Sequence, residues 1–546
     1  MNISAISWRW ILICSGVLLL LMMLAFPFGY DQAAFMIGGE MTIKPGAIPY
    51  RDFLDTKPPV IFIIYGLASL LFGHHEWSIR AFDILFQIGT LLYFFKILSR
   101  ISGDKKFALF SVLLYIVFYV SSGYWMTAQA ETFAMLPSLI IFDLTDRTLK
   151  SSDQRSITQY ATGLYAGVAS AIVFLLKFTL LTVPVAAIIY LILERRSGTQ
   201  SSKKYILGLI VGFVAITGGY LLYLYQTDSL DRFIEALDWV KNYADVDPAF
   251  AMHTIIERYF KQFPMLAIYP FGLSGIILAA LGIVWYFREK LRPSPSMRPQ
   301  EHNRNSAMLH LFLQLCLGLC AVLYERKFFP YHFARCYWAF VPFVVLGIRQ
   351  LRVMWVDYFL SWQRLPMSAK ILRYTIACIA VAAIFFFSTA PRLISQPLHF
   401  VLLRLSGADL PKDVQDQMPQ YYYDEEKKVA DYFRNKIKEE DKVFIWGNSI
   451  GIYFFLNKYP TTICLTNTPL LSAWTPIDWK NTMLGQLEAA PPKYFIAESG
   501  DEREYITASK SDSWQHLKNW SELQIFLEQN YALINELGHF KIFERR

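Results

Sequence analysis

Long apolar blocks recur along this chain, and they restrict its fold more than any other feature of the sequence. The segments 9–28 and 371–390 each hold about twenty residues with few charges, which is the length that an α-helix needs to cross a lipid bilayer. Backbone polar groups find no water inside a bilayer, so segments of this kind must form helices. Hydrophobic residues make up 54% of the chain, whereas soluble proteins have roughly 45–50%. The sequence therefore predicts an all-α polytopic membrane domain.

About eleven apolar segments are candidate transmembrane helices. They cover residues 9–28, 81–98, 107–123, 134–146, 159–176, 178–193, 205–225, 265–286, 307–324, 334–348 and 371–390. The first segment is too long for the hydrophobic region of a cleaved signal peptide, and no clear small-residue cleavage site follows it. We therefore expect it to remain in the protein as the first span.

Lysine and arginine residues gather in every second connection between these segments. The basic connections are 99–106, 147–155, 195–204, 288–304 and 349–370. Because short basic loops stay on the cytoplasmic side of a membrane, this pattern predicts a cytoplasmic N-terminus. The intervening loops and everything after residue 390 are then extracytoplasmic. The net charge of +8 is explained by these loops, and we expect no nucleic-acid partner.

The stretch 49–73, PYRDFLDTKPPVIFIIYGLASLLFG, combines charged residues with an apolar run. The apolar part, 60–73, has about 14 residues, whereas a span needs roughly 20. If it did cross, the basic loops after it would face outward, against the positive-inside pattern. We therefore expect a juxtamembrane helix at the interface, with the charges of 49–57 at the outer membrane boundary.

The composition changes after residue 390, and a small extracytoplasmic α/β domain is predicted there. The sequence thus divides into a transmembrane domain, 1–390, and an α/β domain, 391–546. Strands are expected at 442–447, 461–466, 493–498 and 540–545, with helices at 424–441, about 479–489 and about 519–530 between them. This region contains a single cysteine, Cys464, so no disulfide within it is expected. The WGNS segment after the first strand has the form of a ligand loop, but an ordinary strand-to-helix turn with Asn448 as cap is the favoured interpretation.

Ionisable residues close to membrane segments are costly, so each is a candidate functional residue. Those on the predicted outer side are Asp31, Asp52, Asp55, Lys57, Glu131, Lys177, Arg326, Lys327 and His332. Cations at the interface can hold a lipid phosphate and stabilise the charge that grows on it as it leaves. A nearby carboxylate can remove a proton from an incoming hydroxyl or amine. The pattern therefore indicates group transfer from a lipid-phosphate donor.

These motifs and their order resemble the GT-C membrane glycosyltransferases, in particular the protein O-mannosyltransferase and aminoarabinose-transferase superfamily. The resemblance rests on GYDQAAF at 29–35, on the segment 38–73 with its PYRDFLDTKPP run, on Arg80 and Glu131, and on RKFFPYHF at 326–333. It covers about the first 135 residues well and the remainder loosely. A GT-C fold with interfacial juxtamembrane helices is implied.

The resemblance also implies roles for individual residues. Asp31 would be the catalytic base, with Asp55 and Glu131 as further catalytic carboxylates. The donor phosphate would be bound by Lys57, Arg326, Lys327 and His332, and the candidate substrate contacts are Asp52 and Tyr331. The family often has an acid directly after the first one, whereas this chain has Gln32, which is no acid and a poor metal ligand. No cofactor is expected, and the sequence does not support a divalent metal.

The function expected from these observations is an inverting glycosyltransferase in the bacterial inner membrane. It would move a sugar from a polyprenyl-phosphate donor to a lipid, glycan or protein acceptor on the periplasmic face. Two alternatives stay open: a flippase or transporter for lipid-linked sugars, and a polymerase or ligase of surface polysaccharide. Structural roles also stay open for the candidate residues. Asp31 could end the first helix, Lys57 and Lys177 could be membrane anchors, Glu131 could cap a helix, and His332 could belong to an aromatic belt.

Overall fold

The computed structural model describes residues 3–44, 46–150, 156–194, 200–244, 246, 268–291, 299–360, 390–408 and 421–546, together with scattered positions between 375 and 388. The chain forms two compact units, and each is built from three separate segments. Unit 1 comprises Met1–Phe26, Arg80–Gly218 and Ile256–Leu402, and unit 2 comprises Pro27–Ile79, Gly219–Ile255 and Leu403–Arg546. The sequence-based division at 390 placed 27–79 and 219–255 in the membrane domain, whereas the compact units group them with the C-terminal region.

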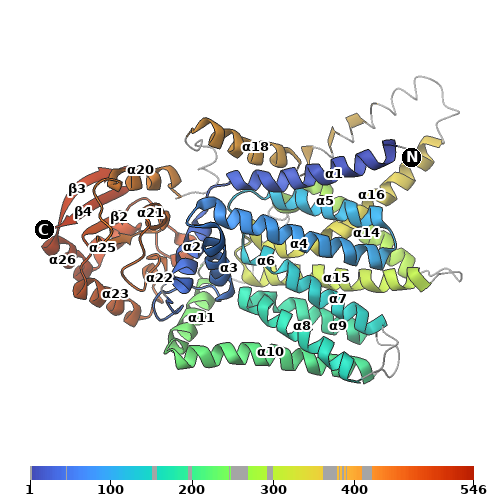
Figure 1. Cartoon of the computed structure of the whole chain (residues 1–546), viewed down its shortest axis with the longest axis horizontal. Helices are drawn as coiled ribbons and strands as arrows, with labels where there is room; N and C mark the ends of the chain where they lie inside the picture. Colours follow the sequence, from blue (N-terminus) through green and yellow to red (C-terminus); the bar gives the residue numbers. More distant parts are fainter. Residues whose placement is uncertain are drawn as a thin grey trace. The chain divides into compact units, whose positions relative to one another are not determined.

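Unit 1 is helical, and its longer helices lie side by side in a bundle (Figure 1). Its elements are α1 (Ile3–Met22), η1 (Met23–Ala25), α4 (Glu76–Ser102), α5 (Lys105–Ser121), α6 (Ala130–Phe133), α7 (Met135–Lys150), α8 (Ser156–Leu176), η2 (Phe178–Leu181), α9 (Thr182–Leu193), α10 (Gln200–Gln226), α14 (Leu273–Leu291), α15 (Pro299–Glu325), η4 (Pro330–Cys336), α16 (Tyr337–Leu360) and α18 (Ala390–Ser406). Of these, α4, α10 and α18 continue into unit 2 at one end.

Ten of the eleven apolar segments predicted from the sequence are helical, and 371–390 lies largely outside the described residues. By length and composition, five described helices can each cross a membrane, or six if α1 and α2 together form one broken span. This number is smaller than the predicted eleven because several apolar helices are short. For example, α5 has 17 residues, α7 has 16 and α9 has 12.

Glycines let α8 and α10 approach each other closely. A Cβ atom on Gly163 would lie 2.1 Å from the carbonyl oxygen of Tyr205, and one on Gly212 would lie 2.4 Å from that of Leu164. Both helices carry two glycines four residues apart, in GLYAG at 163–167 and GLIVG at 208–212. This spacing places both glycines on one helix face, and such faces are typical of helix contacts within membranes.

Unit 2 contains the first long loop of the chain together with a small α/β layer. Its elements are α2 (Tyr30–Ile43), α3 (Val60–Phe72), α11 (Leu230–Ala244), α20 (Tyr423–Phe433), β1 (Val443–Trp446), α21 (Gly451–Phe455), α22 (Thr468–Leu471), α23 (Ile477–Ala489), β2 (Tyr494–Glu498), α24 (Glu504–Thr507), α25 (Ser513–Asn519), α26 (Ser521–Asn530), β3 (Tyr531–Leu537) and β4 (Phe540–Arg545).

The four strands form one mixed sheet with the order β1-β2-β4-β3. β1 and β2 are parallel, whereas β4 pairs antiparallel with both β2 and β3. Every residue of β1 and β2 is buried, which explains why the sequence shows them as continuous apolar runs. The strand predicted at 461–466 is wrong, because only Cys464 makes an isolated bridge there, to Leu54 of the first loop. β3 was not predicted; it is a largely exposed strand at the edge of the sheet.

The helices α2 and α3 pack tightly through two glycines. A Cβ atom on Gly39 would lie 2.6 Å from the backbone nitrogen of Gly66, and one on Gly66 would lie 2.5 Å from the carbonyl oxygen of Gly39. α3 has 13 residues, so its length is ~20 Å, about 10 Å less than a hydrocarbon core. Its length thus agrees with the expectation that this segment is too short to cross a membrane as a straight helix.

Candidate functional site

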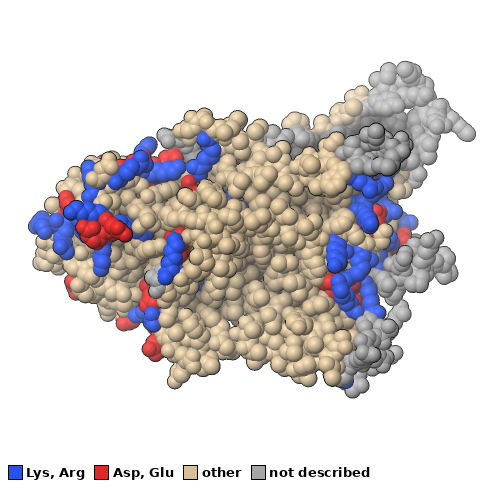
Figure 2. Space-filling model, viewed as in Figure 1, with Lys and Arg blue, Asp and Glu red and all other residues tan. Residues whose placement is uncertain are grey.

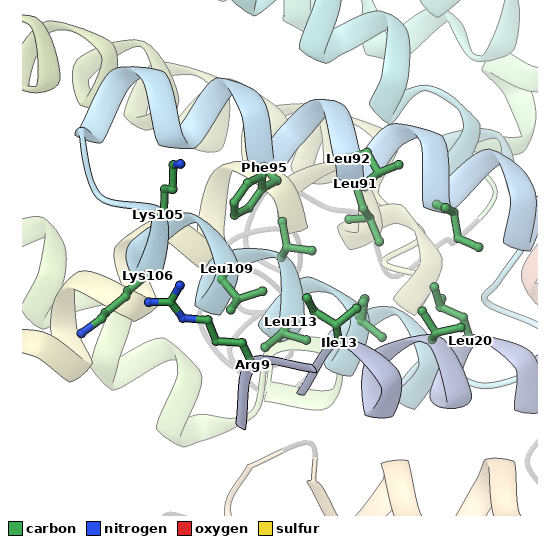
Figure 3. A pocket seen from close by; sticks show the side chains of 14 residues that line it. Arg9, Ile13, Leu20, Leu91, Leu92, Phe95, Lys105, Lys106, Leu109 and Leu113 are labelled. Atoms are coloured by element: carbon green, nitrogen blue, oxygen red, sulfur yellow. The ribbon is translucent and has the colours of Figure 1, made fainter. Parts of the chain in front are cut away.

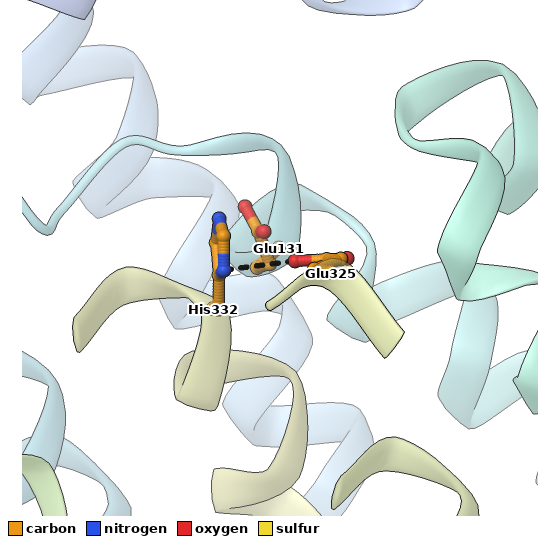
Figure 4. Close-up of side chains that lie close together, drawn as sticks. All are labelled: Glu131, Glu325 and His332. Atoms are coloured by element: carbon orange, nitrogen blue, oxygen red, sulfur yellow. Dashed lines mark ion pairs between the residues drawn. The ribbon is translucent and has the colours of Figure 1, made fainter. Parts of the chain in front are cut away.

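A buried cluster of charged side chains lies in unit 1, where α6, η2, α15 and η4 meet. The Lys177 Nζ atom is 2.6 Å from Glu131 Oε1 and 2.9 Å from Glu325 Oε2. The Arg335 Nη2 atom is 3.0 Å from Glu131 Oε1 and 2.6 Å from Glu325 Oε1. The His332 Nδ1 atom lies 2.8 Å from Glu325 Oε2, and Figure 4 shows the side chains of Glu131, Glu325 and His332 close together. We call these five residues the ion cluster.

The charges of the ion cluster balance. Glu131 and Glu325 supply two negative charges, and Lys177 and Arg335 supply two positive ones. The side chains of Glu131 and Arg335 are only 1% and 2% exposed, so each charge depends on its partners for stabilisation. Burial by itself would raise the pKa of Glu131, but the charges of Lys177 and Arg335 outweigh burial and hold it below its ordinary value. Glu131 is therefore ionised at neutral pH.

The loop before α6 is held by residues of α4 and α5, and this determines where Glu131 lies. The guanidinium of buried Arg80 donates hydrogen bonds to the carbonyl oxygen of Tyr124, at 2.8 Å, and to Thr127 Oγ1, at 3.0 Å. The hydroxyl of Tyr119 accepts a hydrogen bond from the backbone nitrogen of Ala128, which has φ = +57°. Arg80, which the resemblance to the family singled out, is thus a positioning residue for this loop.

Three ligand-type side chains of the ion cluster could face a metal ion. One ligand atom from each of Glu131, Glu325 and His332 lies within 4.8 Å of the others. However, both carboxylates already bind Lys177 and Arg335. Two cations at this distance would repel a divalent ion, so the residues present fit a metal poorly. We derive no step through a metal.

The remaining acids predicted for the site lie in unit 2. Asp31 is in the first turn of α2, where the positive end of the helix dipole favours a carboxylate. Gln32, which replaces the second acid of the family pattern, is buried and accepts a hydrogen bond from the backbone nitrogen of Gly29 at 3.0 Å. Its amide thus closes the start of α2, a structural role that does not need a carboxylate.

The loop that carries Asp55 and Lys57 is folded back on itself. Asp55 Oδ1 accepts a hydrogen bond from the backbone nitrogen of Lys57 at 2.8 Å, and the hydroxyl of Tyr50 donates to the Lys57 carbonyl oxygen at 2.7 Å. Burial and, to a smaller extent, the negative charge of Asp31 raise the pKa of Asp55 to about 6. The hydrogen bond from the Lys57 backbone nitrogen and the charge of Lys57 oppose this shift. Asp31 and Asp55 are therefore electrostatically linked.

Asp52 has a different environment from Asp55. Its carboxylate pairs with the half-exposed guanidinium of Arg51 at 2.7 Å and accepts a hydrogen bond from the backbone nitrogen of Ile48 at 2.8 Å. Both contacts lie within a few residues of Asp52, so they stabilise the local turn.

A second buried acid, Glu40 of α2, connects the first loop to the C-terminal region within unit 2. Glu40 accepts hydrogen bonds from Ser69 of α3 and from the hydroxyl of Tyr459, at 3.2 Å in the latter case. His74 Nδ1 lies 2.9 Å from Glu40 Oε1, and His74 Nε2 lies 2.8 Å from the Phe454 carbonyl oxygen. Both ring nitrogens thus lie within hydrogen-bond distance of oxygen atoms. His74 thus joins the first loop to the C-terminal region within unit 2.

The WGNS loop after β1 is occupied by a side chain of the protein itself. The backbone nitrogens of Asn448 and Ser449 donate to Glu498 Oε2 at 2.6 and 2.9 Å, and the Ser449 hydroxyl donates to Glu498 Oε1 at 2.8 Å. An external anion would have to displace Glu498. The interpretation of this segment as a structural turn is therefore the better one.

The structure brings together some of the predicted site residues within each unit. Unit 1 contains Glu131 and His332, which are in contact through the ion cluster, and Tyr331, whose ring centre is 5.5 Å from Lys177 Nζ. Arg326 and Lys327 are half-buried in the turn between α15 and η4, where Arg326 has φ = +60°. They are not part of the ion cluster, so their assignment to phosphate stays a prediction. Asp31, Asp52, Asp55 and Lys57 belong to unit 2.

Glu325 and Arg335 complete the ion cluster, and the sequence analysis did not select either. Glu325 is the last residue of α15, and Arg335 lies in η4, four residues after Tyr331. Both flank the motif RKFFPYHF and are charged residues next to apolar helices. The sequence signal for both residues is therefore their charge beside an apolar segment, which marks a functional candidate.

Comparison with known proteins assigns this architecture. Residues 56–219 match the family model described as "Dolichyl-phosphate-mannose-protein mannosyltransferase". The chain is also similar to ArnT from Cupriavidus metallidurans, both in the apo state and bound to undecaprenyl phosphate. The TM-scores are 0.58 and 0.56, at 12% sequence identity in both cases. The alignments cover 99% and 98% of this chain and 98% and 97% of the ArnT chains.

The chain thus has the fold of ArnT, and these matches make it similar to the GT-C membrane glycosyltransferases. The expected fold class, a helical membrane domain with a small C-terminal sheet domain, is confirmed. None of the curated protein sequences matches the chain significantly. The family match includes Lys57, Arg80 and Glu131, and it begins directly after Asp55.

Proposed function

We propose that this GT-C protein transfers a sugar from a polyprenyl-phosphate carrier to an acceptor on the extracytoplasmic face of the bacterial inner membrane. The observation that carries the proposal is the match of residues 56–219 to a family whose description names a dolichyl-phosphate sugar donor. The fold supports it, because ArnT, which shares the architecture, has been captured with undecaprenyl phosphate.

Asp31 is the base in this reaction. An acceptor hydroxyl or amine attacks the anomeric carbon of the donor, the bond from that carbon to the phosphate oxygen breaks, and the acceptor proton passes to Asp31. The carrier leaves as polyprenyl phosphate, and the single displacement inverts the anomeric configuration. Asp55, whose pKa is raised to about 6 by burial and by the charge of Asp31, titrates close to neutral pH and orients the acceptor beside the base.

The donor phosphate is held by the cations Lys57, Arg326 and Lys327, with the ring of His332 as a further hydrogen-bonding group. Charge-assisted hydrogen bonds from such groups favour the phosphate as negative charge develops on it. Glu131 stays ionised and, with Glu325, fixes the side chains of Lys177 and Arg335. In this view the ion cluster sets the positions of the cations and of His332, while Asp52 and Tyr331 are candidate substrate contacts.

Purified protein with radiolabelled polyprenyl-phosphate sugars tests the proposal. A transferase releases label from the lipid only when a suitable acceptor is present, and the release stops in the Asp31→Asn variant. A flippase moves the intact lipid-linked sugar across a vesicle membrane without consuming it. A polysaccharide polymerase or ligase consumes an oligosaccharide donor and leaves a single-sugar donor unused. Intact donor after incubation with lipid, glycan and peptide acceptors would overturn the proposal.

The proposed orientation can be tested separately with thiol labelling. Lys510→Cys and Lys105→Cys each place one thiol at an exposed position in a background without the six native cysteines. A membrane-impermeant reagent applied to whole cells with a permeabilised outer membrane should label the variant at 510 and spare the one at 105. Labelling of 105 alone would reverse the assigned orientation while leaving the chemistry in place.

A further inference from the structure

An apolar groove runs along the surface of unit 1 between α1, α4 and α5. Its volume is about 320 Å³, and aliphatic and aromatic side chains form its walls, among them Ile13, Leu20, Leu91, Phe95 and Leu113 (Figure 3). Figure 2 shows that the flank of the helices around it is almost free of charge, whereas lysine and arginine gather at one end. A surface of this composition fits a hydrocarbon chain.

Three basic residues stand at one end of this groove. Arg9 of α1 and Lys105 and Lys106 of α5 line it, and Figure 3 shows their side chains beyond the apolar walls. Both lysines are exposed. Asp104, which directly precedes the two lysines in the sequence, accepts hydrogen bonds from the backbone nitrogens of Lys106 and Phe107 at 2.8 and 3.2 Å. The groove thus has an apolar body and a cationic mouth.

The length of the groove corresponds to one leaflet of a bilayer. From Arg9 to Leu20 the helix α1 advances by eleven residues, which is ~16 Å at the rise of an α-helix. The hydrocarbon core of a bilayer is ~30 Å thick, so one leaflet supplies about half of that. An acyl chain that enters at the cationic mouth would therefore extend about as far as the bilayer midplane.

This groove is separate from the ion cluster. The rings of Phe82 and Phe86, near the start of α4, lie 6.3 and 5.3 Å from that of Phe133, which follows Glu131 in α6. The later part of α4, from Ile88 to Phe95, lines the groove. The two lysines of the groove, Lys105 and Lys106, follow the end of that helix. From Phe86 to the end of α4 at Ser102 the helix rises by ~24 Å. The two sites thus lie toward opposite ends of the bundle.

We propose that the groove binds one phospholipid with an anionic headgroup, drawn from the leaflet opposite to that of the ion cluster. The headgroup phosphate contacts Arg9, Lys105 and Lys106, and one acyl chain lies along α1, α4 and α5. Basic pockets between transmembrane helices are suited to such headgroups. A zwitterionic lipid has the same acyl chain but carries a compensating positive charge, so the cationic mouth selects against it. This site is independent of the sugar donor and of the proposed reaction.

Native mass spectrometry of the full chain tests the site, after reconstitution with equal amounts of phosphatidylglycerol and phosphatidylcholine. The wild-type protein should retain one phosphatidylglycerol at least ~10-fold more often than one phosphatidylcholine, given the attraction of three basic residues. The variant Arg9→Gln/Lys105→Gln/Lys106→Gln should lose this preference. Leu109→Trp, which fills the groove without changing its charge, should lose the bound lipid of both kinds.

A matched control removes three exposed or half-exposed basic residues elsewhere in unit 1, through Lys203→Gln, Lys204→Gln and Arg288→Gln. It should keep the preference for phosphatidylglycerol. If the control lost this preference as completely as the Arg9/Lys105/Lys106 variant, the preference would come from general surface attraction, and the site would be overturned. Equal retention of both lipids by the wild type would show ordinary annular lipid only. Displacement of phosphatidylglycerol by an equimolar amount of undecaprenyl phosphate would assign the groove to the carrier and overturn the proposed occupant.

Discussion

The acids of the two units differ in how they are stabilised. Glu131 and Glu325 in unit 1 are paired with Lys177 and Arg335, and the pKa of Glu131 is held below its ordinary value. Asp55 in unit 2 is half-buried and is influenced by the charge of Asp31, and its pKa rises to about 6. Burial has the same sign in both places, so the difference comes from the neighbouring charges.

This difference in pKa indicates that the acids of the two units are suited to different roles. A carboxylate that remains ionised at all physiological pH values is suited to holding cations in place, but it is a weak proton acceptor. A carboxylate that titrates near neutral pH is suited to proton transfer. We therefore propose that the ion cluster positions cations and that the acids of the first loop are the better candidates for proton transfer.

Arg335→Met should cause the largest loss of stability. It leaves two buried carboxylates with a single strong cationic partner, and breaking a buried pair costs roughly 3–5 kcal/mol. The free energy of unfolding, or the midpoint of thermal unfolding in detergent, measures the effect. Arg434→Met is the matched control, because Arg434 is 74% exposed in its pair with Asp431.

A second measurement connects this loss to charge balance. The double variant Arg335→Met/Glu131→Gln lacks one charge of each sign. Its loss of unfolding free energy should therefore be smaller than the sum of the losses in the two single variants. Strict additivity would mean that the two side chains do not act as one cluster.

Asp31→Asn should reduce turnover by roughly 10²-fold or more, because a general base typically contributes that much. The amide has nearly the same shape, so thermal stability and binding of the carrier should change little. Asp231→Asn, at an exposed position of α11 in the same unit, is the control for the chemical change. A variant with near-normal transfer rates would remove Asp31 from the role of base.

The pH dependence of stability should have opposite signs in the two regions. The folded-state pKa of Asp55, about 6, is higher than the ~3.9 of an unfolded aspartate. The wild-type protein therefore loses stability at this group as the pH rises from about 4 to about 6. Asp55→Asn should raise the unfolding midpoint above pH 6 and have no effect near pH 4.

Glu131 should behave in the reverse way. Its folded-state pKa lies below that of an unfolded glutamate, so its stabilising contribution is complete above pH ~4.5 and is lost as the pH falls through the folded-state pKa. Glu131→Gln should therefore lower the unfolding midpoint at pH 7 and approach the wild type in acid. Differences from the wild type, measured at each pH by scanning fluorimetry, cancel the titration of other groups. The same sign for both variants would contradict the contrast between the regions.

Asp52→Asn should have the smallest effect. Its pair with Arg51 is partly exposed, and changes at such positions usually alter stability by less than ~0.5 kcal/mol. Transfer rates should fall by much less than in Asp31→Asn if Asp52 only supports its own turn. A loss comparable with that of Asp31→Asn would instead support the predicted substrate contact.

Much of this could be predicted from the sequence, because it depends on local patterns. Apolar length identified most of the helices, and the helical class and small C-terminal sheet domain are confirmed. The motifs around Asp31, Lys57 and Glu131 were sufficient to indicate the superfamily. The predicted strand at 461–466 and the missed strand β3 show the limit, since edge strands and isolated bridges depend on what packs beside them rather than on their own composition.

The sequence by itself determined that this protein is a helical membrane protein with charged residues at its loops, because hydrocarbon length and charge segregation are local properties of a chain. Only the tertiary structure decided which charges meet. Lys177 and Arg335 come from separate elements and neutralise Glu131 and Glu325, whereas half-buried Asp55 lies where the charge of Asp31 reaches it. Whether an acid holds a cation or moves a proton follows from its neighbours in space, and no local pattern encodes them.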